Sequence, residues 1–203
     1  MTAIDRYRFL TFSCFSRPAN EVVGCLGELL EARGRKERFR FYTESLSLDA
    51  VYIGEPPRGG AHLVEAAVFS PRTSAGSSVL FANLQDGWSS MVHKLSAVLG
   101  GTSVKVATSG DGFPFPTQWL QLWRGGRSVR IVRVMNDGNR WDFYSEGELQ
   151  SFEQPAYYEK RAIKQRLTRA ILVEYMGKLG WSFDRDDFWQ SEAPAWRLSQ
   201  LRH

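Results

Sequence analysis

The alternation of apolar and polar residues from Gln118 to Tyr144 predicts three consecutive antiparallel strands. The runs WLQLW, SVRIVRVM and RWDFY have strand character, and the sequences GG and NDGN between them are typical of tight turns. Beyond Pro155 the apolar residues adopt helical spacing, which continues from Ala156 until the glycine at Gly180. This part of the chain therefore predicts a three-stranded meander followed by one long, basic, amphipathic helix.

The chain before the meander twice shows the order strand, helix, strand. The first predicted helix ends near Gly34, and the second starts near Asn83 and ends at the pair Gly100–Gly101. The strands predicted outside the meander are 7–15, 38–43, 49–53, 62–69, 79–81 and 103–108.

A small, polar segment at 71–78, PRTSAGSS, is the predicted boundary between two halves of the chain. Residues 1–76 form the N-terminal strand–helix–strand half. Residues 77–203 hold the second helix, the meander, the long helix and an aromatic tail, and can join the first half in one compact domain. Helices interspersed with antiparallel meanders predict an α+β fold, in which antiparallel β-meander sheets pack against helices as an α/β sandwich.

Composition and charge favour a folded, globular protein without a strong electrostatic preference. Of the 203 residues, 43% are hydrophobic, and 26 Lys and Arg stand against 22 Asp and Glu for a formal charge of +4. This excess permits an acidic partner but is smaller than nucleic-acid-binding proteins usually carry. The first twenty residues lack the layout of a secretion signal, and no apolar run approaches the roughly 18 residues that span a membrane. We expect a cytoplasmic protein that does not enter membranes.

The sequence contains few residues that could form a reaction centre. It lacks the GxxxxGK[ST], GxSxG and HExxH motifs, and its histidines are His62, His93 and His203. Neither His62 nor His93 lies at a sequence spacing from a nucleophile that would indicate a catalytic pair. Cys14 and Cys25 have no metal-binding spacing, and we interpret them as reduced, buried thiols rather than a disulfide. We therefore expect no catalytic residue, no metal and no cofactor.

Glu174 is the most unusual acidic residue in the sequence. It falls on the apolar face of the predicted long helix, so its carboxylate should point toward the core, where it needs a partner. We predict a structural ion pair with Arg130 or Arg133. The alternative is a catalytic acid that converges with Asp142.

A binding surface is the better functional candidate. Trp119, Gln121 and Trp123 share one face of the first meander strand, and two leucines share the other. Burying the leucine face costs less free energy than burying the opposite face, because burying Gln121 requires hydrogen-bond partners. Trp and Arg are enriched at binding hot spots, so we predict a partner-binding patch, unless a helix or the aromatic tail covers the tryptophans. The predicted patch consists of Trp119, Gln121, Trp123, Arg124 and Arg127.

A resemblance to a group of known proteins rests on three segments of the sequence, which are DGWSSMVHKLS, VRVM…WDFY and YYEKR…RL…EY…LGW. Across about residues 80–181 the chain resembles a loosely described group of bacterial cytoplasmic proteins that are suspected immunity proteins of secreted, polymorphic toxins. The resemblance implies a non-enzymatic inhibitor that covers the active site of a cognate toxin encoded by an adjacent gene. It supplies no catalytic motif, and it does not extend to the N-terminal half.

Two other functions fit the residues. A nucleic-acid-binding module could stack bases on sheet aromatics and meet phosphates with the basic residues of the long helix. Those residues are Lys160, Arg161, Lys164, Arg166 and Arg169. An enzyme whose carboxylates are dispersed along the chain, such as Glu174 with Asp142, would leave no linear motif.

Overall fold

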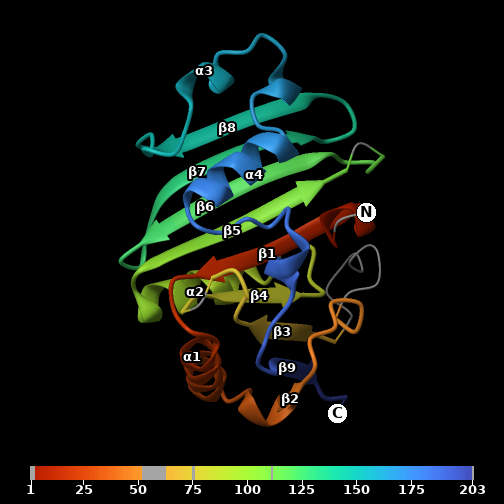
Figure 1. Cartoon of the computed structure of the whole chain (residues 1–203), viewed down its shortest axis with the longest axis vertical. Helices are drawn as coiled ribbons and strands as arrows, with labels where there is room; N and C mark the ends of the chain where they lie inside the picture. The colour runs from red at the N-terminus through yellow and green to blue at the C-terminus, as the bar shows by residue number, and fades with distance from the viewer. Residues whose placement is uncertain (1–2, 52–62, 75, 111, 203) are drawn as a thin grey trace.

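One antiparallel sheet organises the protein, as the computed structural model shows (Figure 1). The structure describes residues 3–51, 63–74, 76–110 and 112–202. The sheet has nine strands in the order β2-β9-β3-β4-β1-β5-β6-β7-β8. The strands are β1 (Phe9–Phe15), β2 (Phe39–Glu44), β3 (Glu65–Phe69), β4 (Ser78–Ala82), β5 (Thr102–Ser109), β6 (Thr117–Arg124), β7 (Arg127–Asn136), β8 (Trp141–Gly147) and β9 (Ala195–Gln200).

Helices occupy both faces of this sheet. The α-helices are α1 (Ala19–Glu31), α2 (Ser89–Leu99), α3 (Pro155–Tyr158) and α4 (Arg169–Lys178), and the 3-10 turns are η1 (Ala3–Arg6), η2 (Lys36–Arg38), η3 (Ile163–Gln165) and η4 (Asp186–Trp189). In Figure 1 α4 lies in front of the sheet, while α2 lies behind it. The expected α+β fold, with an antiparallel sheet between helices, is confirmed.

The strands from the two predicted halves alternate within the single sheet. The meander is present as β6, β7 and β8, and it continues through β5 to β1, which is the central strand. On its other side β1 pairs with β4, and β9 from the end of the chain inserts between β2 and β3. The segment 71–78 therefore connects two neighbouring strands of one sheet, β3 and β4.

The central strand shows why the sheet needs cover on both faces. Every residue of β1 is buried, as expected for a strand sandwiched between two layers. Phe12 and Cys14 belong to the core layer that includes α4 and the tail aromatics Phe183, Phe188 and Trp189. The other layer packs against α1 and α2 and contains Phe15 and Cys25. Both thiols are free and buried, in different layers.

The predicted helix from Ala156 to Gly180 is wrong in its middle. Only its ends are α-helical, as α3 and α4, and η3 lies between them. Thr168 caps α4 by accepting a hydrogen bond from the Ile171 N–H, at 3.3 Å. Arg166 Nε donates to the carbonyl of Lys160 at 2.9 Å, which closes the preceding loop. The basic residues expected along one long helix are therefore distributed over a loop and two short helices.

Three smaller differences concern element boundaries. The second helix begins at Ser89 rather than near Asn83, because residues 83–88 form a turn. Of the predicted strand 49–53, residues 49–51 are a turn and the remainder lies outside the described residues. The predicted strand 62–69 begins at Glu65, and His62 lies outside the described residues. Across the part of the chain that the structure describes, the helices are too short or too polar to cross a membrane.

Candidate functional site

Among the helices of the described residues, none lies over the centre of half of one sheet face. In β6 and β7 the side chains that face α4, such as Leu120 and Val132, are buried, whereas those on the opposite face, apart from Trp123 at the end of β6, are partly or fully exposed. Tyr144 on β8 is 41% exposed. We call this region the open sheet face. It is formed by Trp119, Gln121, Ile131, Arg133, Met135 and Tyr144, which the strand register places side by side.

Cations and aromatic rings alternate across the strands of the open sheet face. Lys105 Nζ lies 4.1 Å from the centroid of the Trp119 ring. The guanidinium carbon of Arg133 lies 5.7 Å from the same ring and 5.5 Å from the ring of Tyr144. We call these four residues the cross-strand stack. Each contact is in the range of a favourable cation–π interaction, so the stack holds long side chains in fixed positions.

Lys105 is the most unusual charged residue of the site. Its side chain is buried, with 2% of the residue exposed, and Nζ donates a hydrogen bond to Ser89 Oγ at the start of α2. Burial lowers the pKa of Lys105 to about 8, while the negative charge of Asp86 acts in the opposite direction. Among the described residues no carboxylate forms an ion pair with Lys105. The site therefore contains a cation that is nearly removed from solvent and has a neutral hydrogen-bond partner.

A tight turn fixes the position of Ser89 opposite Lys105. The carboxylate of Asp86 accepts hydrogen bonds from the N–H groups of Trp88, at 3.1 Å, and Ser89, at 3.3 Å. Trp88 has a left-handed conformation with φ of 61°, which is uncommon for a large residue. Gly87 precedes it with φ of +62°, and a Cβ atom there would lie 2.6 Å from Thr11 Oγ1. The turn thus packs directly onto the central strand, which only glycine permits.

A pocket of about 280 Å³ opens beside the stack. Its apolar lining residues include Phe9, Ala107, Trp119 and Met135. The polar lining residues are Thr11, Gln85, Asp86, Lys105, Thr117 and Arg133. A larger cavity of about 640 Å³ lies near the start of α4, but the buried lysine faces the smaller one. We call the smaller cavity the Lys105 pocket.

The predicted patch is only partly assembled on the accessible surface. Trp119 and Gln121 lie on the open sheet face, and Arg124 and Arg127 are exposed at the tip of the β6–β7 hairpin. Trp123, however, is 2% exposed and belongs to the core layer of α1 and α2. Its assignment to the surface patch is therefore wrong.

The reason is the close approach of α2 to the hairpin. A Cβ atom at Gly126 would lie 3.0 Å from the backbone of Ala97 on α2. The helix therefore reaches the end of β6 and covers the last tryptophan, but it leaves Trp119 uncovered. The alternative prediction, cover by a helix, holds for Trp123.

The predicted ion pair of Glu174 with Arg130 or Arg133 is wrong. Glu174 Oε1 lies 2.6 Å from Lys178 Nζ, one turn along α4, and Oε2 accepts a hydrogen bond from the Tyr157 hydroxyl. The hydrogen bond from Lys178 holds the pKa of Glu174 below its usual value. The buried face of α4 consists of Ile171, Leu172, Tyr175 and Met176, and Glu174 lies beside this face with a partly exposed side chain.

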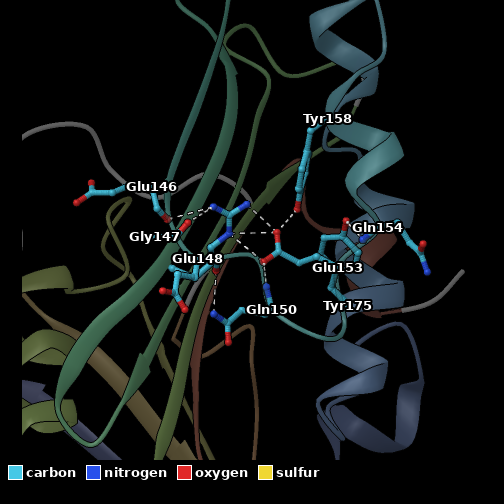
Figure 2. Close-up of polar contacts among 9 residues, drawn as sticks. Glu146, Gly147, Glu148, Gln150, Glu153, Gln154, Tyr158 and Tyr175 are labelled. Atoms are coloured by element: carbon cyan, nitrogen blue, oxygen red, sulfur yellow. Dashed lines mark hydrogen bonds and ion pairs between the residues drawn. The ribbon is translucent and has the colours of Figure 1, made fainter.

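Arg130 instead pairs with Glu153, inside the protein (Figure 2). Arg130 Nη2 lies 2.8 Å from Glu153 Oε2, and Nε lies 2.9 Å from Oε1. The same carboxylate accepts hydrogen bonds from the Gln150 N–H and from the Tyr158 hydroxyl. This network joins β7 to the segment before α3 and has a structural role.

The side chains that a dispersed-carboxylate enzyme would need are not brought together. Asp142 pairs with Arg133 at 3.2 Å on the open sheet face, whereas Glu174 lies on α4, on the other side of the sheet. His93 is exposed on α2. In the described ranges, three or more His, Cys, Asp or Glu side chains do not gather as metal ligands would.

Sequence reasoning missed Lys105, Arg133 and Tyr144 as members of the site. The signal was present in the alternation of β7 and β8, but only the register shows that Trp119, Arg133 and Tyr144 are direct cross-strand neighbours.

Comparisons of the chain with protein-family models, with curated proteins and with solved structures gave no match.

Proposed function

We propose that this chain is a non-enzymatic inhibitor that binds a protein partner through the open sheet face. The observation that carries the proposal is the cross-strand stack of Lys105, Trp119, Arg133 and Tyr144, on a sheet surface that no helix of the described residues covers. Trp, Tyr and Arg dominate the binding energy of protein interfaces. Here they are held in place before a partner arrives, so docking them costs little side-chain entropy.

The area of the open sheet face sets the size of the contact. Three strands about 4.8 Å apart and about seven residues long cover roughly 350 Å². A stable complex needs about 800 Å² on each partner. A partner must therefore extend beyond the strands, and the exposed Arg124 and Arg127 at the adjoining hairpin tip are suitably placed for it.

The class of partner comes from the resemblance of residues 80–181 to suspected toxin immunity proteins. We propose that the partner is a bacterial toxin encoded by an adjacent gene, and that this protein covers its active site. Asp142 and Glu174 lie apart, and this separation supports the hypothesis of an inhibitor over the hypothesis of an enzyme that uses these two carboxylates.

Co-expression with the product of the adjacent gene tests the proposal. We expect the neighbour to be toxic alone and harmless with this protein, and we expect Trp119→Ala and Tyr144→Ala to abolish protection. Tyr42→Ala is a matched control, because Tyr42 also lies under an arginine, Arg40, but on the far edge strand β2. A neighbour that is harmless alone, or protection that survives both variants, would contradict the proposal.

The second candidate is binding of single-stranded nucleic acid to the same face, favoured by the proximity of aromatic rings and cations. Its basic component is weaker than expected, because residues 160–169 form no continuous helix. Titration with a single-stranded oligonucleotide at two salt concentrations distinguishes the two functions. Binding that weakens steeply with salt and is lost in Trp119→Ala would favour nucleic acid.

A further inference from the structure

We infer that the Lys105 pocket is a binding site for a single carboxylate group on a small apolar body. This inference rests on the pocket and its charges, and it holds whether or not the protein partner proposed above exists. Three observations support it: a buried cation without an ion pair, the balance of charges around it, and the chemistry of the pocket lining.

The first observation is the state of Lys105. An ammonium group offers three donors, and the hydrogen bond to Ser89 Oγ uses one of them. The residue is 2% exposed, and it lines the pocket together with the face of Trp119. A buried charge is costly without a counter-charge, so an anion in the pocket would supply an interaction that the described protein groups leave open.

The second observation is that the other charges of the pocket already have partners. Arg133 pairs with Asp142, and the Asp86 carboxylate accepts the N–H groups of Trp88 and Ser89. Lys105 is thus the lining charge without a close partner among the described residues. A ligand with one negative charge matches it, whereas a phosphate dianion would bring a second negative charge for which the described lining has no unpaired cation.

The third observation is the character of the pocket walls. Phe9, Ala107, Trp119 and Met135 provide the apolar part of the lining. The volume of about 280 Å³ is at the lower end of small-molecule sites. The pocket therefore suits a compact ligand that places an apolar ring or chain against Trp119 and a carboxylate against Lys105.

Benzoate is a suitable probe, with benzamide as a neutral molecule of nearly the same shape. We expect benzoate to bind with a dissociation constant on the order of 1 mM, as small ligands of this size do, and benzamide to bind at least tenfold more weakly. Ligand-detected NMR titration of the full chain measures both. Equal affinity for the two probes, or no saturable binding of benzoate, would overturn the inference.

Two variants and a control locate the binding. Lys105→Met keeps an unbranched side chain and removes the charge beside the Trp119 ring, so we expect benzoate to bind at least tenfold more weakly. Ala107→Leu fills the pocket and keeps the lysine, and it should have a similar effect. Lys94→Met removes an exposed lysine of α2 outside the pocket and should change affinity less than twofold. Unchanged affinity in both pocket variants would show that benzoate binds elsewhere and would overturn the inference.

The carboxylate could belong to a free metabolite or to an acidic side chain of a protein. N-acetylglutamate amide presents the side chain without other charges, so its affinity is compared with that of benzoate in the same titration. Tighter binding of benzoate supports a free ligand with an apolar ring. Tighter binding of the glutamate derivative, which lacks an apolar ring, would overturn the inference of an apolar ligand and would indicate an acidic residue of a partner.

Discussion

Arg130 and Glu153 form a two-point ion pair in the interior, with 3% and 1% of their side chains exposed. Nε and Nη2 of the arginine lie 2.9 and 2.8 Å from the two carboxylate oxygens. The remaining guanidinium nitrogen donates to the carbonyl of Gly147 at 2.9 Å. The pair therefore connects strand β7, the end of β8 and the segment that leads to α3.

Removing the cation of this pair should destabilise the protein strongly. Arg130→Met leaves the Glu153 carboxylate buried without its counter-charge, and we expect a loss of about 3–5 kcal/mol in the free energy of unfolding. Urea denaturation measures the loss. Arg127→Met, at the exposed start of the same strand, should change stability by less than about 0.5 kcal/mol. A loss below about 1 kcal/mol for Arg130→Met would contradict the structural role.

The pKa of Lys105 predicts a rise in stability at alkaline pH. The pKa of Lys105 is about 8 in the folded protein and 10.5 as the ordinary value. Between these values the unfolded chain binds more protons than the folded chain, so the contribution of Lys105 increases with pH, by up to roughly 3 kcal/mol. Tyr7 and Tyr158 have raised pKa values, which cause the opposite trend once unfolded tyrosines ionise near pH 10.

The measurement is urea denaturation of the wild type and of Lys105→Met between pH 7.5 and 10. We expect the wild type to gain stability relative to the variant across this window, because the variant has no proton to lose at this position. Lys94→Met should follow the wild type. Parallel curves for wild type and Lys105→Met would show that the folded lysine is not perturbed.

Trp119 and Trp123 should differ sharply when each is replaced by alanine. Trp123 is 2% exposed between the sheet and the two helices, so Trp123→Ala should cost about 3–5 kcal/mol of stability. Trp119 lies partly exposed on the open sheet face, and we expect Trp119→Ala to cost less than half as much. Thermal or urea denaturation of both variants provides the comparison. Equal losses would indicate that Trp119 is also covered.

Two glycines should respond in opposite directions to alanine. At Gly147 φ is +83°, and a Cβ atom would lie 2.0 Å from the carbonyl oxygen of Val129, so Gly147→Ala should be strongly destabilising. Gly24 lies inside α1, and a Cβ atom there meets nothing within 4 Å. Gly24→Ala should therefore raise stability by up to about 1 kcal/mol. Circular dichroism during thermal unfolding distinguishes the two, and a neutral Gly147→Ala would contradict the described end of β8.

The elements that the sequence predicted well depend on short-range signals. The turn residues between β6, β7 and β8 define the meander locally, and the alternation of Leu120 with Trp119 correctly assigned the leucine face to the core. The helix that precedes Gly34 and the strand after Gly101 also follow from local spacing. These features required no knowledge of distant neighbours.

The features that the sequence did not predict depend on packing between distant segments. Whether Trp123 is covered depends on how far α2 reaches along the sheet, and the partner of Arg130 depends on a loop more than 20 residues away. The helical spacing of residues 156–180 persists through a segment that is not helical, because Thr168 provides a competing helix start. Lys105 looked like an ordinary polar position in a strand, since its burial is created by the sheet and α2 together.

The position of β9 determines when the sheet can be finished. Phe39 on β2 pairs with Gln200, and Ala67 on β3 pairs with Arg197, so two early strands await a partner from the end of the chain. During synthesis from the N-terminus, β2 cannot gain this neighbour until residues 195–200 have been added. Contacts so distant in sequence slow folding, and they make β9 a requirement for joining β2 to the rest of the sheet.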